Sequence, residues 1–120
     1  MNSSLLVIGH GSRSQDAVTV FEKIVDLMRS KSDYSHVKGA HMELAEPGVA
    51  PVVEDLVALG VKDIVVVPYF LYEGMHYKND IPEILEELSE RFPAINFKLA
   101  KPIGYEPLLV DVLLQRAAEV

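Results

Sequence analysis

The sequence predicts an α/β fold built on one open sheet of four parallel strands. Short apolar segments alternate four times along the 120 residues with longer segments whose apolar residues recur at helical spacing. Residues 64–67 read Ile-Val-Val-Val, and a fully apolar run is typical of a parallel strand with both faces buried. Strands that alternate with helices pair in parallel through right-handed crossovers, so both observations indicate the same architecture.

The first three elements are a strand, a helix and a second strand. Residues 4–8 form a short apolar run that Gly9 bounds, as expected of a buried strand. Residues 14–30 place apolar side chains at helical spacing between polar ones, which predicts an amphipathic helix. Residues 37–44 alternate more loosely and predict the second strand, which the Pro-Gly pair at 47–48 breaks.

The middle of the chain predicts the second helix and the third strand. Residues 49–59 form a helix that ends at Gly60, because glycine is common just beyond helix C-termini. Residues 63–69 contain the strongest strand signal in the chain, with four consecutive β-branched residues. Residues 70–78 then follow as a loop.

The last three elements are a helix, a strand and a helix. Asp80 and Glu83 form a capping-box pattern, in which Asp80 caps the free backbone N–H groups of a helix over residues 80–92. Residues 96–100 predict the fourth strand, and residues 105–118 predict the fourth helix.

Together these elements predict a flavodoxin-like sheet with strand order 2-1-3-4 and helices on both faces, in a single domain over residues 1–120. In such sheets ligands bind beyond the carboxyl ends of the strands, at the switch point between the first and third strands. That edge brings together residues 9–13 and 70–76, and the second strand ends nearby at residues 43–46. We therefore expect the functional site at this edge.

The composition disfavours several classes of function. The net charge of −7 disfavours nucleic acid and anionic membranes as partners. The chain has no cysteine, which excludes thiolate metal sites and suits a reducing compartment. With no signal-peptide pattern and no apolar run near the ~20 residues that span a bilayer, we expect a cytoplasmic protein. The GxGxxG, Walker A and GxSxG motifs are missing, so nucleotide binding and serine hydrolysis have no specific support.

Two histidines lie in the loops that meet at this edge. His10 follows the first strand between two glycines, and His76 lies at the end of the loop after the third strand. Two imidazoles with nearby carboxylates suit a borderline divalent ion such as cobalt, nickel, iron or zinc. Two histidines leave the coordination incomplete, which favours handing a metal over rather than holding a structural ion. Taken alone, each histidine also fits an ordinary loop or surface residue.

The remaining polar residues near the edge have two interpretations each. Glu43 and Glu46 could bind a ligand group or accept a proton, and they equally fit a solvated loop or a cap for the following helix. His41 lies within the second strand, where packing or a partner contact is favoured over a metal role. His36 lies at the opposite end of that strand.

The chain resembles the CbiX/SirB group of class II chelatases in four segments that occur in the family's order and spacing. These are Val-Ile-Gly-His-Gly-Ser-Arg (7–13), Met-Glu-Leu-Ala-Glu-Pro (42–47), Val-Val-Pro-Tyr-Phe-Leu-Tyr-Glu-Gly-Met-His (66–76) and Asp-Ile-Pro (80–82). Pro-Ile-Gly (102–104) matches as well. The resemblance implies an enzyme that inserts a divalent metal into sirohydrochlorin for cobalamin or siroheme biosynthesis, with cobalt first and iron or nickel as alternatives.

The same resemblance implies roles for individual residues. His10 resembles the proton acceptor and a metal ligand, His76 resembles the second ligand, and Glu43 is a candidate for an assisting acid or base. The positions that resemble substrate contacts are Glu46, Leu71, Tyr72, Glu73, Gly74, Met75 and His76. The metal ion is a substrate, and no organic cofactor is implied. The short chain length implies a homodimer whose two-fold axis mimics the two-lobed, longer members of the family.

Two alternatives to an enzyme remain open. The first is a binding protein that carries a metal or a tetrapyrrole without turnover. The second is a flavodoxin-like signalling or interaction domain, for which neither ligand would raise the melting temperature.

Overall fold

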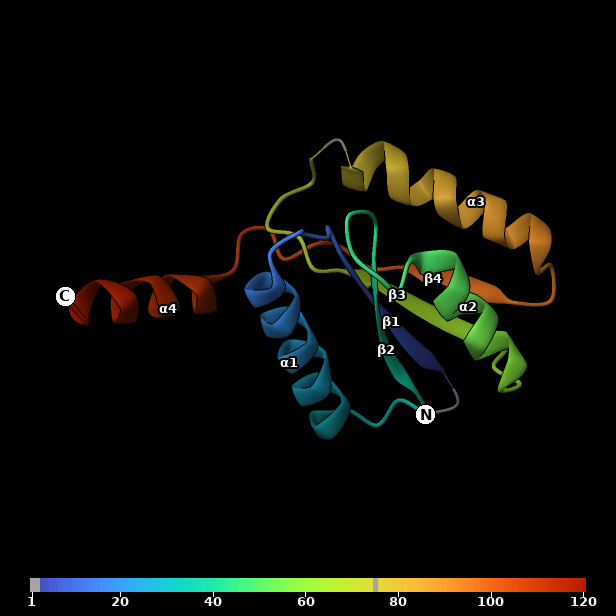
Figure 1. The fold of residues 1–120 in the computed structure, drawn as a ribbon, viewed down its shortest axis with the longest axis horizontal. Helices are drawn as coiled ribbons and strands as arrows, with labels where there is room; N and C mark the ends of the chain where they lie inside the picture. Colours follow the sequence, from blue (N-terminus) through green and yellow to red (C-terminus); the bar gives the residue numbers. More distant parts are fainter. Residues whose placement is uncertain (1–2, 75) are drawn as a thin grey trace.

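The computed structural model describes residues 3–74 and 76–120, apart from the side chains of His76 and Tyr77. Within these residues, strands and α-helices alternate along the chain, and a π-helical turn precedes the third α-helix (Figure 1). The elements are β1 (Ser4–Gly9), α1 (Gln15–Lys31), β2 (Val37–His41), α2 (Val49–Ala58), β3 (Asp63–Pro68), η1 (His76–Asp80), α3 (Ile81–Arg91), β4 (Asn96–Leu99) and α4 (Pro107–Ala118).

The described strands form one parallel sheet in the order β2-β1-β3-β4, as the sequence predicts. β1 lies between β2 and β3, so that Leu6 pairs with Lys38 on one side and with Val66 on the other. From β1 the chain continues to β2 on one side of β1, and from β2 it crosses back over β1 to β3 on the other side. The carboxyl ends of β1 and β3 therefore lie side by side at the switch point.

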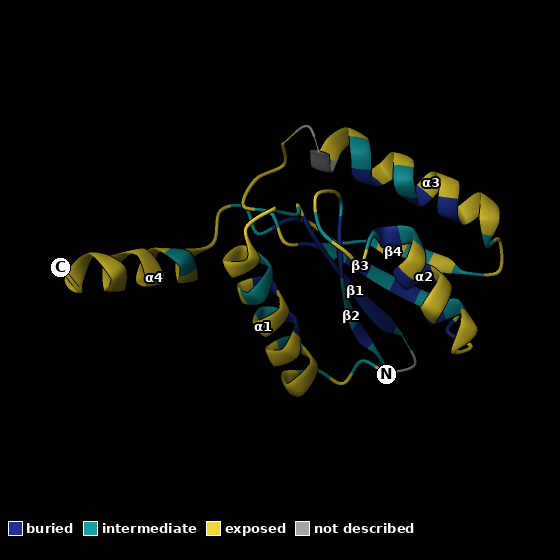
Figure 2. Ribbon diagram, viewed as in Figure 1, coloured by how far each residue is buried: buried dark blue, intermediate teal, exposed yellow. Residues whose placement is uncertain are grey.

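The sheet has an apolar core on each face, because successive side chains of a strand point to opposite faces. Leu6 and Ile8 of β1 face α2 and α3, whereas Leu5 and Val7 face α1. Figure 2 shows the buried residues in the sheet and on the sides of these three helices that face it. The predicted helices on both faces are confirmed, with α1 on one face and α2 and α3 on the other.

β2 ends at His41, earlier than the predicted end at residue 44. The His41 N–H donates to the Pro47 carbonyl at 2.9 Å, which closes a loop directly after the strand. Within this loop Leu44 has a φ of 65°, a left-handed conformation that a strand residue does not adopt. Glu43 and Glu46 consequently lie on a loop instead of a strand end.

The predicted cap of the third α-helix is wrong. The predicted loop reaches residue 78 and the predicted helix begins at Asp80, but residues 76–80 form the π-helical turn η1, which runs directly into α3. Asp80 therefore has helical backbone angles, φ −77° and ψ −44°, and makes no side-chain hydrogen bond that caps α3. A capping side chain needs an extended backbone at the N-cap position, and the chain before Asp80 is already helical.

α4 leaves the body of the protein. In Figure 1 it extends to one side of the sheet and carries the C-terminus at its tip. None of its residues is buried, and the molecule measures 51 × 30 × 27 Å as a result. Among the described helices, none combines the length and the apolar character that a membrane crossing requires.

Candidate active site

The residues that directly follow β2 and β3 are joined to the last residues of β1 by backbone hydrogen bonds at the carboxyl edge of the sheet. The Met42 N–H donates to the Gly9 carbonyl at 2.9 Å, and the Tyr69 N–H donates to the Ile8 carbonyl at 2.8 Å. These two bonds continue the sheet pairing beyond its ends. The edge that the sequence predicts as the site is therefore a single, connected surface.

Gly11 lies against the loop after β2. Its φ is +101°, and a Cβ added there would lie 1.7 Å from the carbonyl oxygen of Glu43. No side chain fits in that space, and an L-residue with this φ is strained. The glycine after His10 thus brings the backbone of the β1 loop into direct contact with the backbone at Glu43.

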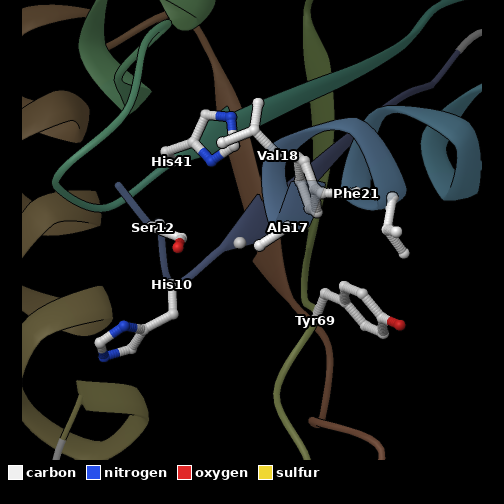
Figure 3. A pocket seen from close by; sticks show the side chains of 10 residues that line it. His10, Ser12, Ala17, Val18, Phe21, His41 and Tyr69 are labelled. Atoms are coloured by element: carbon white, nitrogen blue, oxygen red, sulfur yellow. The ribbon is translucent and has the colours of Figure 1, made fainter. Parts of the chain in front are cut away.

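The His10 side chain is exposed at this edge. Its ring contacts the Phe70 ring edge-on, with 5.8 Å between the centroids, so the loops after β1 and β3 also touch through side chains. Figure 3 shows the His10 imidazole pointing away from Phe21, His41 and Tyr69. An exposed imidazole that is held by its loop and an aromatic neighbour can bind a metal ion or accept a proton.

The other predicted site residues have different surroundings. Glu43 and Glu46 are exposed on the loop after β2, and residues 71–74 are exposed after β3. His76 begins η1, but its side chain and the whole of Met75 lie outside the described residues. Within the part of the chain that is described, no three His, Cys, Asp or Glu side chains gather closely enough to hold a metal ion.

His41 and Ser12 have structural roles. His41 is 4% exposed, and its ring packs on Phe21 with 4.9 Å between the centroids, in agreement with the predicted packing. Ser12 Oγ accepts a hydrogen bond from the Ser14 N–H at 3.0 Å and so supports the turn into α1.

An apolar cavity of about 370 Å³ lies beside the His10 loop, and the sequence does not single it out. Its walls include Val20 and Phe21 of α1 together with His41 and Tyr69. Phe21 fits the helical pattern of a core face, and Val20 is 56% exposed outside that pattern, so neither residue signals a cavity in the sequence. His10 is itself among the residues that line the cavity, although its imidazole points away from the walls formed by Phe21, His41 and Tyr69, so the cavity borders the predicted metal-handling position (Figure 3).

A second feature missed by sequence reasoning is the support of the β3 loop. The Ile103 N–H donates to the Phe70 carbonyl at 2.9 Å, and the Gly104 N–H donates to the Leu71 carbonyl at 2.7 Å. Gly104 has a φ of +63°, which glycine adopts without strain. The Pro-Ile-Gly segment therefore holds the start of the loop that leads to His76.

Comparisons with known proteins agree on one family. The CbiX family model matches residues 4–120. The chain is 35% identical over 112 residues to the chloroplastic sirohydrochlorin ferrochelatase of Arabidopsis thaliana, and this match covers 93% of the chain and 50% of the relative. It is 42% identical over 136 residues to the sirohydrochlorin cobaltochelatase of Methanopyrus kandleri, with 97% of the chain and 95% of the relative covered.

Among solved structures, the sirohydrochlorin chelatase SirB from Bacillus subtilis subspecies spizizenii in complex with cobalt has a TM-score of 0.95 and 29% sequence identity. That similarity covers 100% of this chain and 51% of the SirB chain. The chain thus spans about half the length of SirB and of the Arabidopsis relative. Since the family model extends from the first strand through the last helix, the chain belongs to the CbiX family.

Proposed function

We propose that the chain is a sirohydrochlorin chelatase that inserts a divalent metal ion into the tetrapyrrole, cobalt in the first place and iron or nickel as alternatives. The observation that carries the proposal is the family match over residues 4–120, which includes the loop of His10 at the ligand-binding edge of the sheet. The Arabidopsis and Methanopyrus relatives are named for iron and cobalt, respectively, which supports a divalent late transition metal as the substrate.

Metal insertion replaces two pyrrole N–H protons with one divalent ion, so the site must both deliver the ion and remove protons. A histidine nitrogen that binds the metal cannot accept a proton at the same moment. We therefore assign the two tasks to His10 and His76, with Glu43 as an assisting acid or base. The exposure of His10 and Glu43 supports this assignment, because both side chains can reach a ligand that lies over the edge.

The tetrapyrrole would lie over the loop after β3. Tyr72 is 75% exposed and Leu71 is 50% exposed, and a flat macrocycle would remove part of this apolar surface from water. Contacts from Glu46 and from residues 73–76 complete the proposed substrate set. The hydrogen bonds from residues 103 and 104 support it, because they hold the start of the loop in place before the substrate binds.

We further propose that the enzyme needs no organic cofactor, acts in the cytoplasm and works as a homodimer. The dimer is supported by the half-length match to SirB, since one half of that longer chain corresponds to the whole of this one.

The test is an absorbance assay of cobalt, iron and nickel insertion into sirohydrochlorin by the parent chain and by His10→Ala and His76→Ala. We expect each variant to lose about 10²-fold or more of the insertion rate, the usual range for loss of a proton-transfer group. His36→Ala is the matched control, because His36 precedes β2 at the opposite edge of the sheet, and we expect this variant to keep the parent's rate. Full activity in both His10→Ala and His76→Ala would rule out the proposed roles.

A further inference from the structure

The charge of the chain opposes the binding of its proposed substrate. Sirohydrochlorin carries acetate and propionate arms around its rim, and carboxyl groups of this kind are ionised at neutral pH. The chain has a net charge of −7, and Glu43, Glu46 and Glu73 are exposed in the loops at the carboxyl edge. Salt screens the distant charges over about 8–10 Å, but it does not attract a polyanion. Binding at this edge therefore calls for cationic side chains that contact the arms directly.

Arg13 differs from the other arginines in having no partner within the described part of the chain. The other three each form an ion pair with a carboxylate of the same chain, and these pairs are Arg29–Asp26, Arg91–Glu54 and Arg116–Glu119. Arg13 is exposed and makes no ion pair or side-chain hydrogen bond with any described residue. Its planar guanidinium keeps five N–H donors, in a fork that matches the two oxygens of a carboxylate.

The backbone is fixed on both sides of Arg13. Before it, Gly11 lies so close to the Glu43 carbonyl that no side chain fits between them. After it, Ser14 is the N-cap residue of α1 and donates its N–H to Ser12 Oγ at 3.0 Å. The side chain of Arg13 thus extends from a held loop, and a held loop lowers the cost of ordering when a ligand binds.

Arg13 also lies near the proposed metal-handling position. It follows His10 by three residues, and because a chain advances at most about 3.6 Å per residue, their Cα atoms lie within about 11 Å of each other. A macrocycle whose central nitrogens lie at His10 presents its acid arms farther out, at its rim. The arms, and not the reacting centre, are therefore the part of the substrate that suits a guanidinium at this place.

We propose that Arg13 binds one acetate or propionate arm of the tetrapyrrole and thereby selects a macrocycle that carries carboxylates. The inference rests on the proposed function, because it assigns a contact to the substrate of that site. Two parallel N–H bonds from the guanidinium to the arm both offset one negative charge and orient the ring over His10. Since the arm takes no part in metal insertion, the contact acts on binding of the macrocycle and leaves the insertion step unchanged.

The test compares the parent with Arg13→Gln, Arg13→Lys and Lys62→Gln. Binding of metal-free sirohydrochlorin is measured by calorimetry, and cobalt insertion by absorbance. We expect Arg13→Gln to raise both the Kd and the KM for sirohydrochlorin about 10- to 100-fold, the range for hydrogen bonds between charged groups. Its kcat and its KM for cobalt should remain those of the parent. Arg13→Lys keeps the charge without the paired donors and should fall between the two.

Lys62→Gln is the matched control for charge. Lys62 is exposed and precedes β3, at the opposite edge of the sheet, so this variant loses the same charge and should bind sirohydrochlorin as the parent does. The methyl ester of sirohydrochlorin is the matched control for the ligand. Its arms carry no charge, and we expect the parent and Arg13→Gln to bind it equally.

The outcomes separate this inference from the proposed function. A parent chain that neither binds nor metallates sirohydrochlorin would remove the proposed function and this contact with it. A parent that does both, with Arg13→Gln indistinguishable from Lys62→Gln, would overturn the role of Arg13 alone. A loss confined to kcat would also overturn it, because Arg13 would then act in the insertion step. So would an equal weakening of acid and ester binding, which would indicate a general disturbance of the loop.

Discussion

At the residue scale, the candidate site depends on close backbone contact as much as on its histidines. The predicted place of His10 follows from its position directly after an apolar strand, because strand ends of parallel sheets share one edge. The contact between Gly11 and the Glu43 carbonyl could not be predicted, since the sequence does not say which loop a glycine approaches. The erroneous cap at Asp80 has a similar cause: a capping pattern does not reveal that the preceding residues are already helical.

Gly11→Ala tests this contact, with Gly60→Ala as the matched control. Both glycines have positive φ, +101° and +85°, but a Cβ at Gly60 would meet nothing within 4 Å. Backbone strain alone costs about 1–3 kcal/mol, so Gly60→Ala should lower the free energy of unfolding by that amount. Gly11→Ala should lower it further and slow metal insertion, whereas Gly60→Ala should leave insertion unchanged. The measurements are urea unfolding and the absorbance assay. Equal losses of unfolding free energy in the two variants would contradict the importance of this contact, because the loops after β1 and β2 would then separate at little cost.

At the element scale, helical and strand periodicity predicted which segments would form and which faces would be buried. The helices that pack on the sheet do so through residues that fall on the apolar side of each pattern. The end of β2 was placed too late because its loose alternation continues beyond His41, where the backbone already turns. An alternating pattern indicates which side chains suit a strand. It does not reveal the positive φ of Leu44, at which the backbone turns after β2.

Leu56→Ala in α2 and Leu27→Ala in α1 test the buried face of a helix against an exposed one. Leu56 is 0% exposed in the core of α2, α3 and the sheet, whereas Leu27 is 55% exposed. The cavity that Leu56→Ala leaves should lower the free energy of unfolding by about 2–5 kcal/mol. Leu27→Ala should change it by less than about 1 kcal/mol, because little apolar surface is involved. Urea unfolding at one protein concentration compares the two, and a small loss at Leu56 would contradict the described core.

At the scale of the whole molecule, the strand order and the edge that holds the site were predictable from the alternation of elements. The place of α4 was not. Its pattern predicts a helix with an apolar face, but a pattern cannot tell whether that face packs on its own sheet or on another molecule. The prediction of a tetrapyrrole substrate came from the family motifs. The chemistry of His10, His76 and the carboxylates alone would not have specified it.

The central claim is that the chain turns over as a chelatase, and the most direct measurement counts the products that each chain makes. Sirohydrochlorin and buffered cobalt, in large excess over the parent chain, are followed by absorbance until the reaction stops, with an identical mixture that lacks the protein as the reference. We predict many cobalt-sirohydrochlorin molecules per chain, formed faster than in the reference. One product or fewer per chain, or a rate equal to that of the reference with cobalt, iron and nickel alike, would contradict the account and favour a binding protein.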